Sequence, residues 1–423
     1  MSKIAAFSDL HLSPAGRKTD DDTGLNARFL DVVRSMEWIV KDANERGCSS
    51  MLFGGDMFRT NRPTPTELMY ARNALAQWPY PLIMIPGNHD LPRGRFEHNS
   101  LAPIARAFPP QPDHVSAIGS PGMWLVNQPM VIKVMSGEYS LATLPYPNKT
   151  QLATSLPGYA DMADSEIESL LGAHLGVIIQ GLAAECQERG LPSVLLAHIS
   201  VDTAKTGDEG IMAGRDICLN LAQIPESFTC VVLGHIHRGQ RLRENVYYCG
   251  SPDRVDFGEE EKDDQEPKSY LVIDTETGYV ERIPVPTRPF RTFHVNMKLV
   301  PSDIPGSLVT ETTDDLPGYD TETAGLARNA VCRVKLRRPA SARPDYADVE
   351  GRLRDAGCWD FRGFVEDVDQ LTGGREPAIL TAGSPSEMLG IWATGRDLPA
   401  GITPDDLQSA YMELCGAQTE GRY

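Results

Sequence analysis

Five short apolar runs in the first 240 residues each end in side chains that bind metal ions. Each run is four or five residues long, and Asp, Asn or His follows it directly or within a few residues. The runs with their polar ends are IAAFSDLH (4–11), SMLFGGD (50–56), PLIMIPGNHD (81–90), SVLLAH (193–198) and TCVVLGHIH (229–237). Short apolar runs that alternate with helical patterns are typical of a layered α/β fold. This alternation is the strongest constraint on the fold.

Helical patterns occupy the segments between these runs. Apolar residues recur at helical spacing from Phe29 to Val40 and from Ile167 to Leu182, and glycines at 47 and 190 follow them as stop signals. Because the carboxyl ends of strands in an open α/β sheet meet at one crevice, we expect the polar ends to converge. We also expect Asp-x-His and His-x-His to place both side chains on one side of an extended backbone.

The polar ends together form a specific set of metal donors. The predicted ligands are Asp9, His11, Asp56, Asn88, His198, His235 and His237. Carboxylate, imidazole and amide oxygen without thiolate favour Mn, Fe or Zn, and a carboxylate such as Asp56 can bridge two cations. A lone histidine after a strand is usually an ordinary polar residue, but five such strand ends in one chain are not expected by chance. The sequence therefore predicts a two-metal centre, and such centres hydrolyse phosphate esters.

The chain changes character near the proline-rich stretch PVPTRPF (284–290). Beyond it, a strand pattern (330–338), a helix pattern (346–357) and a further strand pattern (365–369) indicate a small α+β unit. Two short helical patterns follow from residue 384, and each opens with Ser-Pro or Thr-Pro, as a capped helix does. We therefore predict domains at 1–285 and 286–372, followed by a linker and helical tail at 373–423.

Net charge and hydropathy limit the classes of function that the chain can have. The formal net charge of −18 argues against indiscriminate phosphate binding, so a DNA enzyme of this composition would confine its positive charge to one groove. No run of 18 or more apolar residues occurs, and the N-terminus lacks the features of a signal peptide. The sequence predicts a cytoplasmic protein without a membrane span.

The motifs D-x-H, GD, GNHD, H and GHxH resemble those of the calcineurin-like metallophosphoesterases. Four further segments, GGDMF with NRPTP, LATLPYP (141–147), CGSPDRVDFGEEE (249–261) and TRPFRTFHV (287–295), are similar to the SbcD nucleases, the bacterial and phage counterparts of the Mre-eleven nuclease. The likeness covers roughly residues 3–370. It implies an α/β fold with a two-sheet sandwich flanked by helices, a small α+β capping domain that contacts DNA, and a C-terminal helical tail that binds a partner.

The resemblance also implies residue roles. One metal would be held by Asp9, His11, Asp56 and His237, and the other by Asp56, Asn88, His198 and His235. His89 would stabilise the transition state or help the leaving oxygen depart, and Asp90 would orient His89. The expected metal is Mn²⁺, with Mg²⁺, Fe and Zn left open. The expected activities are 3′-to-5′ double-strand exonuclease and single-strand endonuclease, in a homodimer that assembles with an SMC-like ATPase, SbcC, into a heterotetramer for DNA repair and recombination.

Basic residues near the motifs are candidate DNA contacts. Those that follow the second and third motifs are Arg59, Arg62, Arg93 and Arg95. Relatives usually have a histidine or an acidic residue at the position of Arg59, so a phosphate contact replaces any acid–base role there. In the capping domain, alternation places Arg333, Lys335 and Arg337 on one strand face, which also suits a plain solvated face. The run GEEEKDD (258–264) is expected to form a solvated loop.

Two other functions remain open at this point. The first is a phosphatase or phosphodiesterase of the same superfamily that acts on a small molecule or a protein. Ser/Thr phosphatases have GD-x-x-DRG and GNHE where this chain has GDMFRTN and GNHD, and cyclic-nucleotide phosphodiesterases usually lack the added domain and tail. The second is a non-catalytic scaffold for an ATPase, which is disfavoured because every ligand position is filled.

Overall fold

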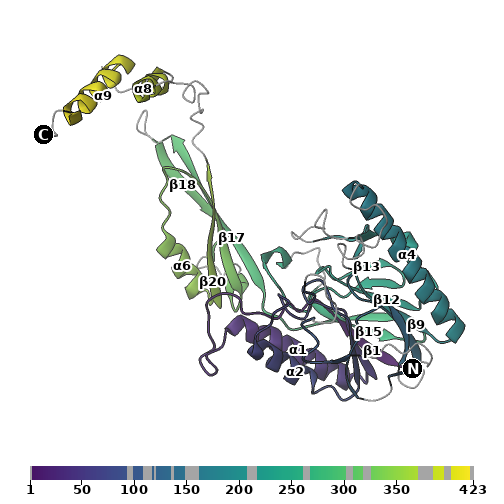
Figure 1. The fold of residues 1–423 in the computed structure, drawn as a ribbon. Coiled ribbons are helices and arrows are strands. Elements are labelled where there is room, and N and C mark those ends of the chain that lie inside the picture. The colour runs from purple at the N-terminus through teal and green to yellow at the C-terminus, as the bar shows by residue number, and fades with distance from the viewer. Residues whose placement is uncertain are drawn as a thin grey trace. The chain divides into compact units, whose positions relative to one another are not determined.

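The computed structural model of the chain is shown as a ribbon in Figure 1. It describes residues 2–92, 99–107, 117–118, 121–134, 138–147, 162–206, 217–260, 267–301, 308–317, 325–369, 384–394 and 402–419. Within these residues, one seven-stranded sheet has the order β16-β15-β1-β2-β3-β6-β4 and a second has the order β13-β14-β12-β9-β8-β7-β5. The strands of the first sheet are, in that order, Val280–Pro284, Ser269–Asp274, Lys3–Phe7, Ser50–Phe53, Pro81–Met84, Gly122–Leu125 and Arg106–Ala107. Those of the second are Gln240–Arg243, Val246–Tyr248, Cys230–Gly234, Ser193–His198, Tyr139–Leu144, Met130–Val134 and Ala117–Ile118.

The five motif-bearing runs are central strands of these two sheets. β1, β2 and β3 are neighbouring parallel strands of the first sheet, and β9 and β12 pair in parallel in the second. Parallel neighbours end at the same edge of a sheet, so three motifs leave the first sheet together and two leave the second together.

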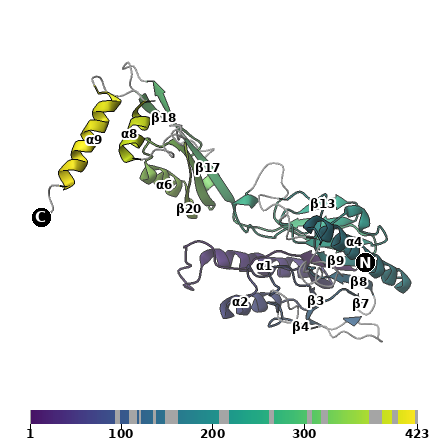
Figure 2. The ribbon, with the colours of Figure 1, turned by 45° about the horizontal axis from the view of Figure 1, so that its top comes forward.

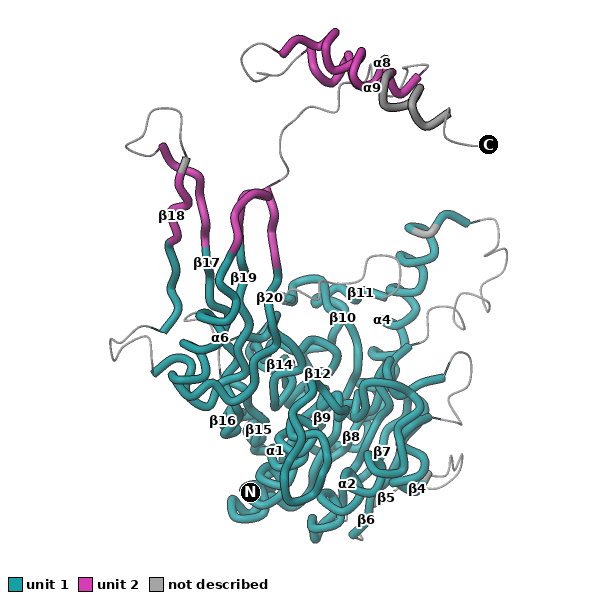
Figure 3. Tube along the Cα trace, turned by 90° about the vertical axis from the view of Figure 1, so that its left-hand side faces the viewer, with its two compact units in different colours: residues 1–295, 313–336, 344–365 teal, residues 296–312, 337–343, 366–423 magenta. Residues whose placement is uncertain are grey.

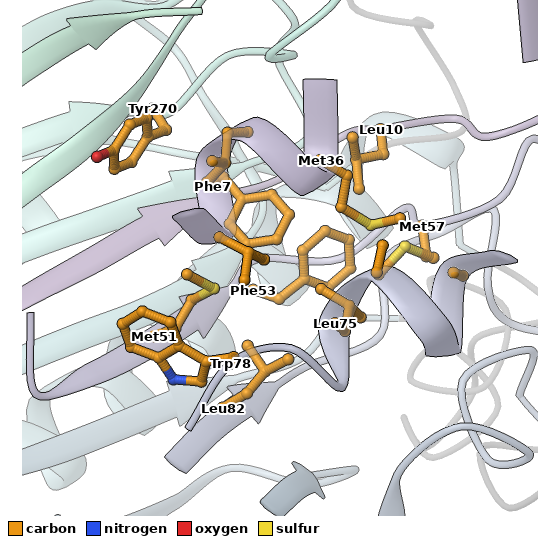
Figure 4. Close-up of a cluster of buried hydrophobic side chains, with 14 of the residues drawn as sticks. Phe7, Leu10, Met36, Met51, Phe53, Met57, Leu75, Trp78, Leu82 and Tyr270 are labelled. Carbon is orange, nitrogen blue, oxygen red and sulfur yellow. The ribbon is translucent and has the colours of Figure 1, made fainter. Parts of the chain in front are cut away.

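Three helices cover the outer faces of the two sheets (Figures 1 and 2). α1 (Ala27–Glu45) begins at Asn26, whose side chain accepts the N–H of Phe29. α2 (Pro65–Leu75) begins with a capping box between Thr64 and Glu67. Both pack on the first sheet, where the rings of Phe7 and Phe53 lie 5.1 Å apart in the buried cluster of Figure 4. On the second sheet lies α4 (Asp164–Arg189), which ends at a left-handed glycine at 190.

A separate apolar core lies between the two sheets. Its side chains are fully buried and come from both sheets, including Ile4, Leu52 and Ile83 from the first and Leu196 and Val232 from the second. Each such side chain contributes roughly 1.5–3 kcal/mol of hydrophobic free energy when it is fully buried. The layers therefore run helix, sheet, sheet, helix, and the predicted α/β sandwich flanked by helices is confirmed.

By length and composition alone, α4 could cross a membrane, which the sequence analysis did not expect. Among the described residues it is the one helix that meets this criterion. Its apolar residues Leu171, Leu175 and Ile179 are buried in the core under the second sheet, as those of a core helix are. Its exposed face still includes Val177, which is 65% exposed.

The part of the chain after residue 285 contains a four-stranded sheet of order β18-β17-β19-β20. Its strands are Leu308–Asp314, Phe290–Pro301, Val331–Pro339 and Asp360–Asp369, and α6 spans Tyr346–Asp355. The predicted strand at 330–338 and the helix at 346–357 are confirmed, whereas the last strand begins five residues earlier than predicted, at 360 rather than 365. In the described part of the chain a further short pair, β10 (Ser200–Val201) and β11 (Cys218–Leu219), completes the strands.

Contacts divide the chain into two compact units, which Figure 3 distinguishes by colour. The first unit comprises residues 1–295, 313–336 and 344–365, and the second comprises residues 296–312, 337–343 and 366–423. The two predicted tail helices, α8 (Pro385–Thr394) and α9 (Pro404–Thr419), are confirmed as helices and contact each other. The side-chain amide of Gln408 donates to the carbonyl oxygen of Ser386 over 3.0 Å. The predicted domain boundaries after residues 285 and 372 stay predictions.

Candidate metal centre

The structure brings the seven predicted ligands together at the carboxyl ends of the five strands. Asp9, His11 and Asp56 come from loops after β1 and β2, and their side chains are at most 6% exposed. The ligand atoms of Asp9, His11 and His237 lie within 4.8 Å of one another, as do those of Asp9, Asp56 and His198. Two strand edges from separate sheets thus supply one cluster.

One side of the cluster consists of His11, His237 and the carboxylate of Asp56. Nε2 of His11 lies 2.9 Å from Nε2 of His237 and 3.7 Å from Oδ2 of Asp56. Nδ1 of His237 donates to Oε1 of Glu259 over 2.7 Å, so its Nε2 atom faces the cluster. This is how a metal-binding histidine is usually oriented, with its second nitrogen held by a carboxylate.

The other side consists of Asn88, His198 and His235. Oδ1 of Asn88 lies 3.0 Å from Nε2 of His198 and 3.0 Å from Nδ1 of His235. Nδ1 of His198 donates to the carbonyl oxygen of Gly54 over 2.6 Å, and Nε2 of His198 lies 3.4 Å from Oδ2 of Asp56. The carboxylate of Asp56 therefore lies between the two sides, where a bridging ligand is required.

The backbone of the ligand loops is left-handed rather than extended. The φ angles are 56° at Asp9, 46° at His11, 58° at Asp56 and 95° at His235. This corrects the expectation that Asp-x-His and His-x-His would project from an extended strand. Residues other than glycine rarely adopt positive φ, and such strain clusters at functional sites because the surrounding structure over-determines it.

Glycines permit the close approach of these loops. A Cβ atom at Gly87 would lie 2.2 Å from Oδ1 of Asp56, and one at Gly55 would lie 2.6 Å from both Nδ1 of His198 and the backbone N of Gly87. Gly55 also has a φ of 101°. A side chain at either position would therefore displace ligands.

Burial and neighbouring charges shift the pKa values of Asp56, His198 and His11. Burial opposes the charge of Asp56, but His198 and His11 outweigh it, so the pKa of Asp56 lies well below its ordinary value. Burial lowers the pKa of His198, but the carboxylate of Asp56 outweighs it and the pKa reaches about 9. Burial and the neighbouring His237 hold the pKa of His11 well below its ordinary value.

The donor chemistry fits two divalent cations. With Nδ1 of His198 donating to Gly54, a neutral His198 presents a lone pair on Nε2 to the oxygen of Asn88, so two acceptors face each other unless a proton or a cation lies between them. On the other side, Nδ1 of His237 donates to Glu259, so its Nε2 atom presents a lone pair 2.9 Å from Nε2 of His11. A cation on each side would be bound by these acceptors, and the oxygen and nitrogen donors suit Mn, Fe or Zn.

His89 lies at the exposed rim of the cluster. Its backbone N–H donates to Oδ1 of Asp56 over 2.8 Å, and its ring centroid lies 4.7 Å from that of His11. Nδ1 of His89 donates to the carbonyl oxygen of Arg59 over 2.8 Å. The proton is thereby placed on Nδ1, which leaves Nε2 as the nitrogen that can accept.

The position of Asp90 corrects its expected role. Its buried carboxylate accepts the backbone N–H groups of Asp56 at 2.7 Å, Gly87 at 3.0 Å and Met57 at 3.2 Å, and the hydroxyl of Ser100 at 2.8 Å. Asp90 therefore ties the second motif loop to the third, and the carbonyl of Arg59 orients the His89 ring instead. Burial and the nearby charge of Asp56 raise the pKa of Asp90 to about 6.

Glu259 is a site residue that the sequence analysis missed. It was expected in a solvated loop, yet it is 8% exposed and binds His237, the hydroxyl of Ser251 at 2.7 Å and the ammonium of Lys268. Burial opposes its charge, but Lys268 and His237 prevail and hold its pKa well below the ordinary value. The sequence signal that could have identified Glu259 is its position in CGSPDRVDFGEEE, one of the segments that resemble the SbcD nucleases. The remainder of the predicted loop, from 261, lies outside the described residues.

The predicted DNA contacts differ in their surroundings. Arg59, Arg62 and Lys335 have exposed side chains, whereas Arg93 and Arg95 lie outside the described residues. Nε of Arg333 donates to the hydroxyl of Thr292 over 2.8 Å, and its guanidinium lies 4.4 Å from the ring centroid of Phe257. Arg337 forms an ion pair with Asp369 over 3.2 Å. Arg333 therefore packs within the structure. Lys335 has an exposed side chain and forms no ion pair with the residues that the structure describes.

Comparison with known proteins places the chain among metallophosphoesterases. One curated relative, the DNA double-strand break repair protein Mre11 of Saccharolobus solfataricus, is 22% identical over 316 residues, which cover 72% of this chain and 69% of the relative. Among solved structures, TT1561 of Thermus thermophilus is 14% identical (TM-score 0.35, 67% of this chain, 99% of the other). A dimetal phosphatase from Danio rerio is 11% identical (TM-score 0.33, 64% and 91%). The family model described as calcineurin-like phosphoesterase matches residues 2–239. Since this match spans more than half of the 423 residues, the chain belongs to the calcineurin-like phosphoesterase family.

Proposed function

We propose that the chain is a metal-dependent DNA nuclease of the SbcD type, which hydrolyses phosphodiester bonds as a subunit of a DNA repair and recombination complex. The observation that supports it most is the cluster in which Asp56 lies between His11 and His198, with Asn88 and His237 on either side. Its proposed activities are 3′-to-5′ exonuclease on double strands and endonuclease on single strands.

The candidate ligands fall into two sets, one for each proposed cation. Asp9, His11 and His237 would hold one cation, Asn88, His198 and His235 the other, and Asp56 would bind both. Two divalent cations, proposed to be Mn²⁺, supply a nucleophile at neutral pH and neutralise charge on the phosphate. Glu259 and the carbonyl of Gly54 orient two of the imidazoles, so these ligands need no rearrangement to bind.

His89 is the proposed catalytic residue of the protein itself. Its Nδ1 proton is held by the carbonyl of Arg59, and its backbone is held by Asp56. With the ring at the exposed rim, Nε2 can take up a proton and then donate it to the leaving oxygen or to a phosphate oxygen. Such general acid and electrostatic assistance is typically worth roughly 10²- to 10⁴-fold in rate.

DNA is the proposed substrate because of two further observations. The relative from Saccharolobus solfataricus is a DNA double-strand break repair protein, and its likeness covers 72% of this chain, well beyond the 2–239 match to the family model. The exposed arginines at 59 and 62 follow Asp56 by three and six residues, so they are the proposed phosphate contacts in an otherwise acidic chain. A cytoplasmic location, a homodimer and an SMC-like ATPase partner complete the proposal.

Hydrolysis of linear duplex DNA in manganese, measured beside hydrolysis of bis(p-nitrophenyl) phosphate, tests this function. The purified Asp56→Ala variant is the control for contaminating nucleases, because it removes the shared ligand. We expect DNA degradation from 3′ ends by the wild type and none by the variant. Dye hydrolysis without DNA degradation would instead indicate a small-molecule phosphodiesterase, and no hydrolysis of either would indicate a scaffold.

A further inference from the structure

Two adjacent glutamates bind in opposite directions at the end of the short 3-10 helix Phe257–Glu259. Glu259 reaches the metal centre, where its Oε1 atom accepts Nδ1–H of His237 over 2.7 Å. Glu260 reaches strand β17, where its Oε1 atom accepts the backbone N–H of Thr292 and its Oε2 atom accepts the Thr292 hydroxyl, each over 2.5 Å. The two glutamates are neighbours in the chain, so the contact with the candidate ligand His237 is directly joined to the contact with β17, which begins at Phe290.

The contact at Glu259 is rigid. Its Oε2 atom accepts from the Ser251 hydroxyl at 2.7 Å, from the backbone N–H of Val255 at 3.3 Å and from the ammonium of Lys268. A carboxylate with so many donors cannot move without breaking several charge-assisted bonds. The orientation of the His237 ring is thus tied to the position of this helix.

The contact at Glu260 is equally well supported. The Thr292 hydroxyl that donates to Glu260 accepts Nε of Arg333 from β19 over 2.8 Å. The ring centroid of Phe257 lies 4.9 Å from that of Phe290 on β17, and the Arg333 guanidinium lies over the ring of Phe257. All these residues belong to the first unit, coloured teal in Figure 3. A displacement of β17 would therefore pull on the helix that holds Glu259.

We propose that Glu259 and Glu260 link β17 to the metal centre, so that the position of β17 sets metal affinity through His237. Glu259 is a positioning residue and Glu260 is the coupling residue. The inference rests on the proposed metal centre but not on the identity of the substrate. Loss of a carboxylate that orients a metal-binding histidine typically costs 10- to 100-fold in metal affinity.

Calorimetric titration of the metal-depleted full chain with Mn²⁺ tests the link. We expect Glu259→Gln to weaken one of the two sites by roughly 10- to 100-fold. Glu260→Gln should weaken the same site by roughly 2- to 30-fold, since coupling residues that do not touch the ligand contribute about 0.5–2 kcal/mol. The double variant should bind no more weakly than Glu259→Gln alone. Glu350→Gln, on the exposed face of α6, is the matched control and should bind as the wild type does.

The outcomes separate this inference from the proposed function. Wild-type affinity in Glu260→Gln, or losses that simply add in the double variant, would overturn the link. A folded wild-type chain that binds no Mn²⁺ would instead overturn the metal centre itself. Thermal melting in EDTA shows whether each variant is folded. If Glu259→Gln fails to fold, Glu260→Gln and Thr292→Val decide, because both weaken the contact between Glu260 and β17 and leave the bond between Glu259 and His237 in place. Both should weaken the same metal site.

Discussion

The backbone N–H of His89 donates a hydrogen bond of 2.8 Å to Oδ1 of Asp56. The carboxylate that lies between the two halves of the cluster is thereby fixed by the residue proposed to act on the phosphate. Oδ2 of Asp56 faces His11 and His198. Because His89 contributes its backbone to Asp56 and presents its ring at the rim, ligand and catalytic roles can be tested separately.

Replacement of Asp56 by alanine should abolish phosphoester hydrolysis and weaken metal binding. Oδ2 of Asp56 lies 3.7 Å from Nε2 of His11 on one side and 3.4 Å from Nε2 of His198 on the other, so both cations lose a ligand. Elemental analysis should find fewer than two Mn per chain, while circular dichroism stays that of the folded protein. Near-normal nuclease activity of this variant in manganese would show that the ligand assignment is wrong.

Replacement of His89 by asparagine should lower turnover by roughly 10²-fold or more, because a positioned imidazole stabilises charge on the leaving oxygen. Metal content should stay at the wild-type level, because the backbone N–H that binds Asp56 remains. His174→Asn, on the exposed face of α4, is the control and should change neither quantity. Parallel loss of metal and turnover in His89→Asn would assign His89 to the ligands.

Metal affinity should rise with pH because His198 must lose a proton to bind a cation. Its pKa of about 9 means that the imidazole is protonated at neutral pH in the apoprotein, so metal must displace that proton. From about pH 7.5 to about pH 9, affinity at this site should increase about tenfold per pH unit and then level off. An ordinary imidazole, with a pKa near 6.5, is already neutral in this range. Calorimetry in buffers of different ionisation enthalpy counts the released proton, and affinity that is flat over this range would contradict the prediction.

Much of the fold and the convergence of the candidate ligands could be predicted from the sequence because both depend on local patterns. The strands at 50–53 and 193–197 are apolar runs, and the polar residues that follow a central strand of a parallel sheet must meet at its edge. The partners of Asp90 and Glu259 depend on long-range packing. Asp90 binds a backbone 34 residues away, and Glu259 binds a histidine 22 residues away. The positive φ angles at Asp9 and His11 likewise arise from tertiary structure, since the sequence pattern alone suggested an extended chain.

Neutral substitutions of exposed basic residues should flatten the salt dependence of DNA binding. Arg62→Gln beside the site and Lys335→Gln on β19 should each reduce the slope of log affinity against log salt concentration by about one unit for each phosphate that the basic side chain binds. Arg333→Gln should instead lower stability, because Arg333 bonds Thr292 and lies over Phe257. Lys41→Gln, on the exposed face of α1, is the control. An unchanged slope in both Arg62→Gln and Lys335→Gln would place the DNA surface elsewhere.

Removal of the chain beyond residue 375 should separate catalysis from partner binding. The deleted segment contains α8 and α9, which contact each other and expose Met388 and Trp392, one helical turn apart, at 39% and 42%. Two short helices cannot form a core by themselves, so their apolar faces require a surface. The proposed ATPase partner would supply one if the helices dock in a groove of its coiled coil. We expect the truncated protein to keep manganese-dependent nuclease activity and to lose co-purification with the SMC-like ATPase. A full-length Met388→Ser/Trp392→Ser variant should lose the partner as well while α8 and α9 stay helical. Undiminished co-purification of the truncated protein would exclude the tail as the principal partner site.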